Sequence, residues 1–132
     1  MLKIDQVGGK GRGAIATQPV KQGSLIEASP VCTLPSDQRK LLKETTLFEY
    51  YFVQPSEYHS RKDQASGHIV FGLSSFCNHS VRPNAKIEWV DRKDGLWAHL
   101  IAIRDIQIDE EVTLHYTNLN EYPSAELFTE AR

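Results

Sequence analysis

The chain has 132 residues, of which 40% are hydrophobic and 24% charged, and its formal net charge is −2 at pH 7. These values are typical of a soluble globular protein, and the length leaves room for one sizeable core, so we expect a single domain over residues 1–132. The small negative charge does not favour binding to nucleic acid through bulk charge, and we predict no direct nucleic-acid binding. No apolar run is long enough to span a membrane, so we predict no membrane association.

The two cysteines, Cys32 and Cys77, lack the Cys-x-x-Cys spacing that is typical of zinc sites. Two cysteines exclude a structural zinc site made of cysteines and argue against a disulfide framework. We therefore expect reduced thiols, no metal, and a cytoplasmic location, or a nuclear one in a eukaryote. The amino terminus has no apolar stretch of the kind found in secretion signals, which agrees with this expectation.

The chain order of hydrophobic and turn-forming residues predicts mainly short strands. Strands are expected at residues 3–7, 14–16, 24–27, 31–34, 47–54, 69–71, 85–89, 97–103 and 112–116. A short helix is expected over residues 37–43 with Ser36 as its N-cap, and the polar residues 56–67 are expected to form a loop. Many short strands with frequent turn signals predict a mostly β domain, α+β only in a minor way, with one or two short helices.

Residues 8–13 form a glycine-rich segment with four glycines and the cations Lys10 and Arg12. Glycine lets the backbone approach a ligand closely and expose its N–H groups, and the cations suit a carboxylate or a phosphate. The segment is not a P-loop, because the G-x-x-x-x-G-K-[ST] pattern is absent, and no helix pattern follows as in a Rossmann fingerprint. The alternative interpretation is a flexible hairpin turn.

Two further segments carry polar side chains. Residues 75–85 contain Asn78, His79 and Asn84. Their directional donors and acceptors indicate either a loop that holds a polar ligand or a plain hairpin loop that carries polar side chains. Residues 109–116 lead from three acidic residues into a strand that ends in His115 and Tyr116. Paired carboxylates suit acid/base chemistry or a metal, but acidic residues in a turn more often face water.

Acidic residues also dominate the end of the chain. Residues 105–131 contain seven acidic residues and no lysine or arginine. Such a stretch can attract a cationic partner, or it can form an ordinary solvated surface.

Together, the order and spacing of the three segments resemble the motif order of SET domains. The chain resembles the compact, free-standing SET-domain protein lysine methyltransferases of bacteria and large viruses, over about residues 8–122. This resemblance implies a β-clip fold of small curved sheets, with a pseudoknot in which the C-terminal segment passes through a loop near residues 78–80. It also implies methyl transfer from S-adenosyl-L-methionine to a lysine of a protein, such as a basic segment of a histone, histone-like or ribosomal protein, and a homodimer is possible.

The resemblance also implies roles for individual residues. Tyr116 is the expected catalytic residue, and Tyr116 and His115 are expected to bind the substrate. The cofactor is expected to contact Lys10, Gly11, Arg12, Gly13, Tyr51, Phe76, Asn78, His79 and Tyr122.

The sequence departs from the family pattern in places. No cysteine follows Cys77, so a zinc cluster after the domain is not expected, and Tyr122 and Phe128 are expected to close the site instead. Position 115, which is often Asp in the family, is His here. Two rival readings stay open: a catalytically silent SET-like interaction module, and an unrelated β-clip domain that binds a small anion at residues 8–13.

Overall fold

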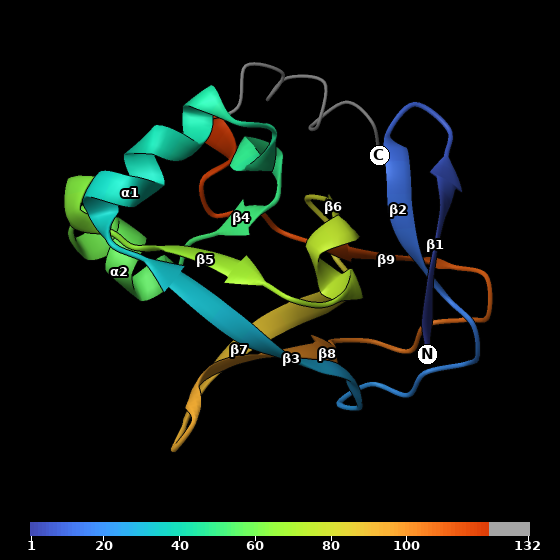
Figure 1. The fold of residues 1–132 in the computed structure, drawn as a ribbon. Helices are drawn as coiled ribbons and strands as arrows, with labels where there is room; N and C mark the ends of the chain where they lie inside the picture. The colour runs from blue at the N-terminus through green and yellow to red at the C-terminus, as the bar shows by residue number, and fades with distance from the viewer. Residues whose placement is uncertain (122–132) are drawn as a thin grey trace.

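The computed structural model describes residues 1–121, whose strands form two small sheets (Figure 1). The four-stranded sheet has the order β1-β2-β9-β6, and the five-stranded sheet has the order β4-β5-β3-β8-β7. The first sheet consists of β1 (Leu2–Val7), β2 (Gly11–Ala16), β9 (Glu111–Leu114) and β6 (Asn78–His79). The second consists of β4 (Tyr51–Phe52), β5 (Gly67–Val70), β3 (Leu25–Leu34), β8 (Gly95–Ala102) and β7 (Ala85–Arg92).

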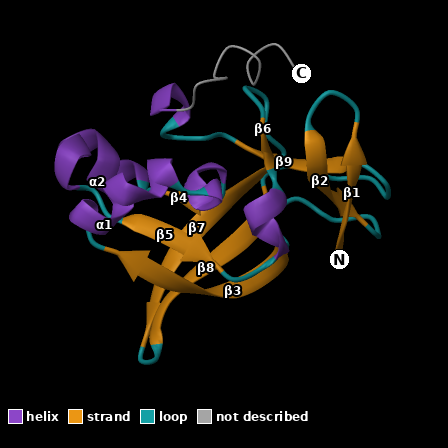
Figure 2. Cartoon of the chain, turned by 45° about the horizontal axis from the view of Figure 1, so that its top comes forward, coloured by secondary structure: helices purple, strands orange, loops and turns teal. Residues whose placement is uncertain are grey.

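The helices are short, and they lie mostly on the side of the molecule away from the β1–β2 hairpin (Figure 2). Two are α-helices, α1 (Ser36–Leu41) and α2 (Pro55–Ser60). The 3-10 helices are η1 (Leu42–Glu44), η2 (Thr46–Glu49), η3 (Lys62–Gln64), η4 (Leu73–Phe76) and η5 (Leu119–Glu121). The predicted fold class, mostly β with short helices in small sheets, is confirmed. No helix among residues 1–121 is long and apolar enough to cross a membrane.

The first sheet brings the three sequence motifs together. Antiparallel pairing joins β1 to β2 and β2 to β9, while β6 pairs with β9 in parallel, opposite Thr113 and Leu114. The glycine-rich segment is tighter than predicted, because residues 11–13 belong to β2 and only residues 8–10 form the turn. Gly9 and Gly11 have φ values of 77° and 78°, which glycine adopts without strain. The parallel pair places β6 beside β9, but passage of the chain end through a loop remains an expectation.

The second sheet corrects several predicted boundaries. The expected strands 24–27 and 31–34 are one strand, β3, which pairs with β8 up to Pro30 and with β5 from Val31 onward. Pro30 lies where the neighbour changes, so its missing N–H interrupts neither ladder.

Three other expectations about secondary structure were wrong. Within residues 47–54, residues 47–49 belong to η2 and only residues 51–52 form a strand, and the expected loop at residues 56–67 contains α2 and η3. Pro55 stands in the first turn of α2, where the absence of its N–H costs nothing. Ser36 is the first residue of α1 and not its cap, because Pro35 occupies the cap position.

Two apolar clusters form the core. The larger cluster includes the fully buried Leu100, Ile106 and Val112 and is built from residues of both sheets. The smaller cluster includes Leu42, Tyr51 and Tyr58, and it draws on α2 and β4. The smaller cluster therefore joins the helical side of the molecule to the end of the second sheet.

Candidate active site

A cavity of about 240 Å³ lies beside the β1–β2 hairpin, and we call it the polar cavity. Residues from β2, β6, η2 and η4 contribute to it. Its lining consists of Lys10, Gly11, Arg12, Glu49, Tyr50, Ser75, Phe76, Asn78 and Tyr116. Aromatic rings form part of this wall: the Arg12 guanidinium lies 4.9 Å from the Phe76 ring centroid, and the Tyr50 and Phe76 rings are 5.4 Å apart. The cavity thus combines two cations with flat aromatic surfaces.

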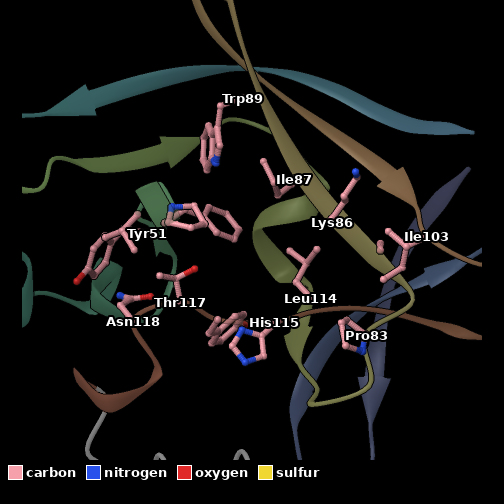
Figure 3. Close-up of a pocket in the computed structure, with 15 residues that line it drawn as sticks. Tyr51, Pro83, Lys86, Ile87, Trp89, Ile103, Leu114, His115, Thr117 and Asn118 are labelled. Atoms are coloured by element: carbon pink, nitrogen blue, oxygen red, sulfur yellow. The ribbon is translucent and has the colours of Figure 1, made fainter. Parts of the chain in front are cut away.

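A second cavity, of about 220 Å³, is mostly apolar, and we call it the apolar cavity (Figure 3). It lies between β4, β7 and the segment that follows β9. Its lining consists of Tyr51, Phe52, Val53, Pro55, Pro83, Ala85, Lys86, Ile87, Trp89, Ile103, Leu114, His115, Tyr116, Thr117 and Asn118. In Figure 3, Trp89 lies at the upper end, and His115 and Pro83 lie at the opposite end.

Tyr116 lines both cavities. Its backbone N–H donates a hydrogen bond to Nδ1 of His79, at 2.9 Å, and its hydroxyl donates to the backbone carbonyl of Cys77, at 2.6 Å. The first bond places the proton of a neutral His79 ring on Nε2. The second commits the phenolic proton to a carbonyl, which leaves the phenolic oxygen able to accept a hydrogen bond from a ligand.

Asn78 is held by groups from two neighbouring strands. Its side-chain amide donates to Oε2 of Glu111, at 2.8 Å, and to the backbone carbonyl of Arg12, at 3.2 Å. Oε1 of Glu111 forms an ion pair with Nζ of Lys10, at 3.0 Å. Gly13 lies directly behind, because a Cβ there would stand 2.9 Å from both Asn78 Nδ2 and Glu111 Oε2.

Glu111 is a site residue that the sequence reading missed. The side chain was expected to face water in an acidic turn, but only 17% of it is exposed and it binds two residues of the polar cavity. The strand was expected to begin at residue 112, but β9 begins at Glu111, so this side chain belongs to the sheet and not to the preceding turn.

The predicted residues divide between the two cavities. The predicted cofactor-binding residues that line the polar cavity are Lys10, Gly11, Arg12, Phe76 and Asn78. Gly13 and His79 are buried behind this wall, the former against Asn78 and the latter against Tyr116.

The remaining predicted residues lie elsewhere. Tyr51 lines the apolar cavity, and its neighbour Tyr50 lines the polar one. Tyr122 and Phe128 lie outside the described residues. His115 and Tyr116, the predicted substrate-binding pair, both line the apolar cavity.

A buried polar cluster stands behind the wall of the apolar cavity. Glu121 binds Arg39 at 3.0 Å, and it accepts hydrogen bonds from the hydroxyls of Tyr51 and Tyr58. Burial, together with the Glu121 carboxylate, raises the pKa of Tyr51 to about 12. Burial alone would raise the pKa of Glu121, but hydrogen bonds from Tyr51, Asn118, Tyr58 and Arg39 outweigh it and hold that pKa below its usual value.

Comparison with known proteins identifies the class that this fold and site define. A model of the SET domain family matches residues 11–117. The match covers most of the chain, and the chain belongs to the SET domain family.

Several relatives and solved structures agree with this assignment. The chain is 27% identical over 116 residues to the H3 lysine-37 specific histone-lysine N-methyltransferase of Schizosaccharomyces pombe, covering 87% of this chain and 72% of that protein. It is 33% identical over 118 residues to the H3 lysine-36 specific enzyme of Yarrowia lipolytica, covering 86% of this chain but 15% of that protein.

The structural neighbours share the fold. The Neurospora SET domain protein DIM-5, a histone lysine methyltransferase, matches with a TM-score of 0.64 and 23% identity over 89% of this chain and 52% of that one. A candidate histone methyltransferase of Plasmodium falciparum matches with a TM-score of 0.64 and 20% identity over 88% of this chain and 96% of that one.

Proposed function

We propose that this chain is an S-adenosyl-L-methionine-dependent protein-lysine N-methyltransferase. The observation that carries the proposal is that Tyr116 lines two separate cavities, one polar and one apolar. A reaction between a cofactor and a long side chain needs two approaches that meet at one point. The names of the relatives, which are histone-lysine N-methyltransferases, support the same reaction class.

The donors of the polar cavity fit the proposed cofactor. Lys10 and Arg12 offer cations for its carboxylate, and Phe76 and Tyr50 offer ring surfaces against which adenine can pack. Glu111 holds the Lys10 and Asn78 side chains in place before any ligand arrives. When bound, S-adenosylmethionine supplies a methyl group attached to a positively charged sulfur.

The apolar cavity fits the stem of a lysine side chain. A lysine amine has a reference pKa of about 10.4, and only the neutral amine has the lone pair that a methyl transfer needs. Walls such as Phe52, Ile87 and Trp89 disfavour the charged form by desolvation. The Tyr116 oxygen can accept a hydrogen bond from the amine and so direct its lone pair toward the polar cavity.

The proposed substrate is a protein with a lysine in a basic segment, such as a histone, histone-like or ribosomal protein. Among residues 105–121, Asp105 and Asp109 are exposed, whereas Glu110, Glu111 and Glu121 form ion pairs within the chain. Within this described part, Asp105 and Asp109 are therefore the acidic residues best placed to attract a basic segment, and the attraction would weaken as salt increases. A cytoplasmic or nuclear location, a homodimer and a single domain over residues 1–132 stay predictions.

Methyl transfer tests the proposal directly. Purified protein is incubated with labelled S-adenosylmethionine and candidate basic proteins, and label on lysine is measured. The Tyr116→Phe variant should lose activity by on the order of 10²-fold while it keeps cofactor affinity, because only the oxygen is removed. Equal activity in this variant would overturn the role of Tyr116.

Calorimetry with S-adenosylmethionine separates the rival readings. Binding that requires Asn78 supports the methyltransferase. No binding would favour a silent interaction module, and binding of simple anions without a requirement for Asn78 would favour the anion-binding domain.

A further inference from the structure

One carboxylate, that of Glu121, joins four structural elements. Its partners are Arg39 on α1, Tyr51 on β4, Tyr58 on α2, and Asn118 on the segment that follows Tyr116. Arg39 also donates to the backbone carbonyl of Lys62 at 3.0 Å, which ties η3 to the same cluster. The final described turn of the chain is therefore fastened to the helical side of the molecule.

The two oxygens of Glu121 have different kinds of partner. Oε1 accepts from the Tyr51 hydroxyl and, at 3.3 Å, from the Asn118 amide, and both residues line the apolar cavity. Oε2 accepts from Arg39 at 3.0 Å and from the Tyr58 hydroxyl at 2.9 Å, and neither of these lines the cavity. One oxygen thus holds two wall residues together, and the other anchors the carboxylate to the helices.

Burial makes this arrangement stiff. Arg39 is 7% exposed, so its guanidinium has little access to water as an alternative partner. Without Glu121, the cluster would keep a buried cation near two buried hydroxyls. Among residues 1–121, Glu121 is the only carboxylate that pairs with Arg39.

We propose that Glu121 is a positioning residue that fixes the width of the apolar cavity by holding Tyr51 and Asn118 together. Because Asn118 follows Tyr116 by two residues, the same contact limits the movement of the tyrosine segment. The idea that Glu121 thereby controls the fit of the target lysine rests on the proposed methyltransferase function. Loss of the Glu121 contacts should widen the apolar cavity, and this widening can be measured without activity.

The kinetic test uses Glu121→Gln, which keeps the side-chain shape and removes the charge. We expect the KM for the protein substrate to rise by about tenfold, as for loss of a hydrogen bond to a charged group. The affinity for S-adenosylmethionine should stay within about twofold, because Glu121 contacts no residue of the polar cavity. An equal weakening of substrate binding and cofactor binding, or no change in the KM for the protein substrate, would overturn the proposal.

Val20→Ala serves as the stability control, because Val20 is buried in the larger cluster and lines neither cavity. It should lower the melting temperature without raising the KM for the protein substrate. A rise in KM as large as that of Glu121→Gln would mean that loss of stability alone explains the effect, and it would overturn the proposal.

Trp89, a wall residue, gives a readout that needs no turnover. In a Trp97→Phe background, Trp89 is the sole tryptophan, and acrylamide quenching reports its exposure. Glu121→Gln should increase the quenching, and Val20→Ala should not. Unchanged quenching in Glu121→Gln would overturn the proposal, and absence of methyl transfer by the parent protein would instead count against the proposed function.

Discussion

At the scale of single residues, the polar cavity depends on close contact behind Asn78. Gly13 is buried, and a Cβ there would approach Val7 Cγ2 to 2.7 Å in addition to the polar atoms of Asn78 and Glu111. Contacts under 3 Å force a neighbour to move. The requirement for glycine at this position is therefore one of space, since its φ lies outside the left-handed region, unlike those of Gly9 and Gly11.

We predict that Gly13→Ala disturbs the polar cavity selectively. The added methyl displaces Asn78 or Glu111, so affinity for S-adenosylmethionine should fall, and stability should fall by roughly 1–3 kcal/mol. Calorimetry and denaturant unfolding measure the two effects. Gly8→Ala is the matched control, because its Cβ meets nothing within 4 Å. Similar behaviour of the two variants would contradict the prediction.

At the scale of elements, Asn84 connects the polar segment after β6 to β9. Its Oδ1 accepts from the Thr113 N–H at 2.9 Å, and its Nδ2 donates to the Glu111 carbonyl at 2.8 Å. Asn84 is 1% exposed, so these bonds have no solvent substitute. Of the two asparagines that suggested a ligand site, Asn78 therefore lines a cavity and Asn84 has a structural role.

We predict that Asn84→Ala destabilises the protein by roughly 2–3 kcal/mol, because buried backbone groups of β9 lose their partners. The free energy of unfolding in denaturant measures this loss. Asn120→Ala, at an exposed position, should change stability by less than about 0.5 kcal/mol. Equal unfolding midpoints for the two variants would show that Asn84 does not pin β9.

The strands and helices also show which secondary structure could be predicted from sequence patterns. The alternating pattern of residues 85–89 and the strand that follows the turn were predicted because hairpin signals are local, although the turn residues are Lys93 and Asp94 and Gly95 already belongs to β8. The single strand β3 was not predicted in this way, because proline is usually confined to edge strands, strand starts and bulges, whereas Pro30 lies within β3 where the neighbouring strand changes from β8 to β5. The aromatic residues 47–52 resembled a strand, but their burial arises from contacts with distant segments such as Tyr58 and Phe76.

At the scale of the whole molecule, stability should depend on pH through the Glu121 cluster. The pKa of Glu121 lies below its usual value of 4.5, so its contribution is present above that value and is lost as pH falls through the lowered pKa. The pKa of Tyr51 is raised from 10.0 to about 12, so its contribution is present below pH 10 and is lost between pH 10 and about 12.

We therefore predict a plateau of stability near neutral pH with a fall on each side. Burial also lowers the pKa of His68 from 6.5, which adds a loss of stability as pH falls below that value. Unfolding free energies measured across pH test this, and Glu121→Gln should flatten the steepest acid part of the curve and the alkaline fall. If the stability of Glu121→Gln depended on pH as that of the parent protein does, the Glu121 cluster would not be the source of the pH dependence.

The order of the three motifs predicted the family and the residues around the polar cavity. Their assembly was implied by the resemblance to SET domains, and the structure places β2, β9 and β6 side by side in one sheet. The assignment of individual residues to one cavity or the other was not predicted around residues 47–54, because that segment was expected to be one strand and instead contains part of η2, a turn residue and the two residues of β4. Tyr50, which follows η2, lines the polar cavity, whereas Tyr51, the first residue of β4, lines the apolar cavity.

The central claim is that a cofactor and a lysine reach Tyr116 from two different cavities. The most direct measurement is a crystal structure with S-adenosylhomocysteine and a lysine peptide bound together. The account predicts the cofactor product beside Arg12, Phe76 and Asn78, with the lysine amine in the apolar cavity within hydrogen-bond distance of the Tyr116 oxygen. Cofactor product in the apolar cavity, or a lysine amine remote from Tyr116, would contradict it.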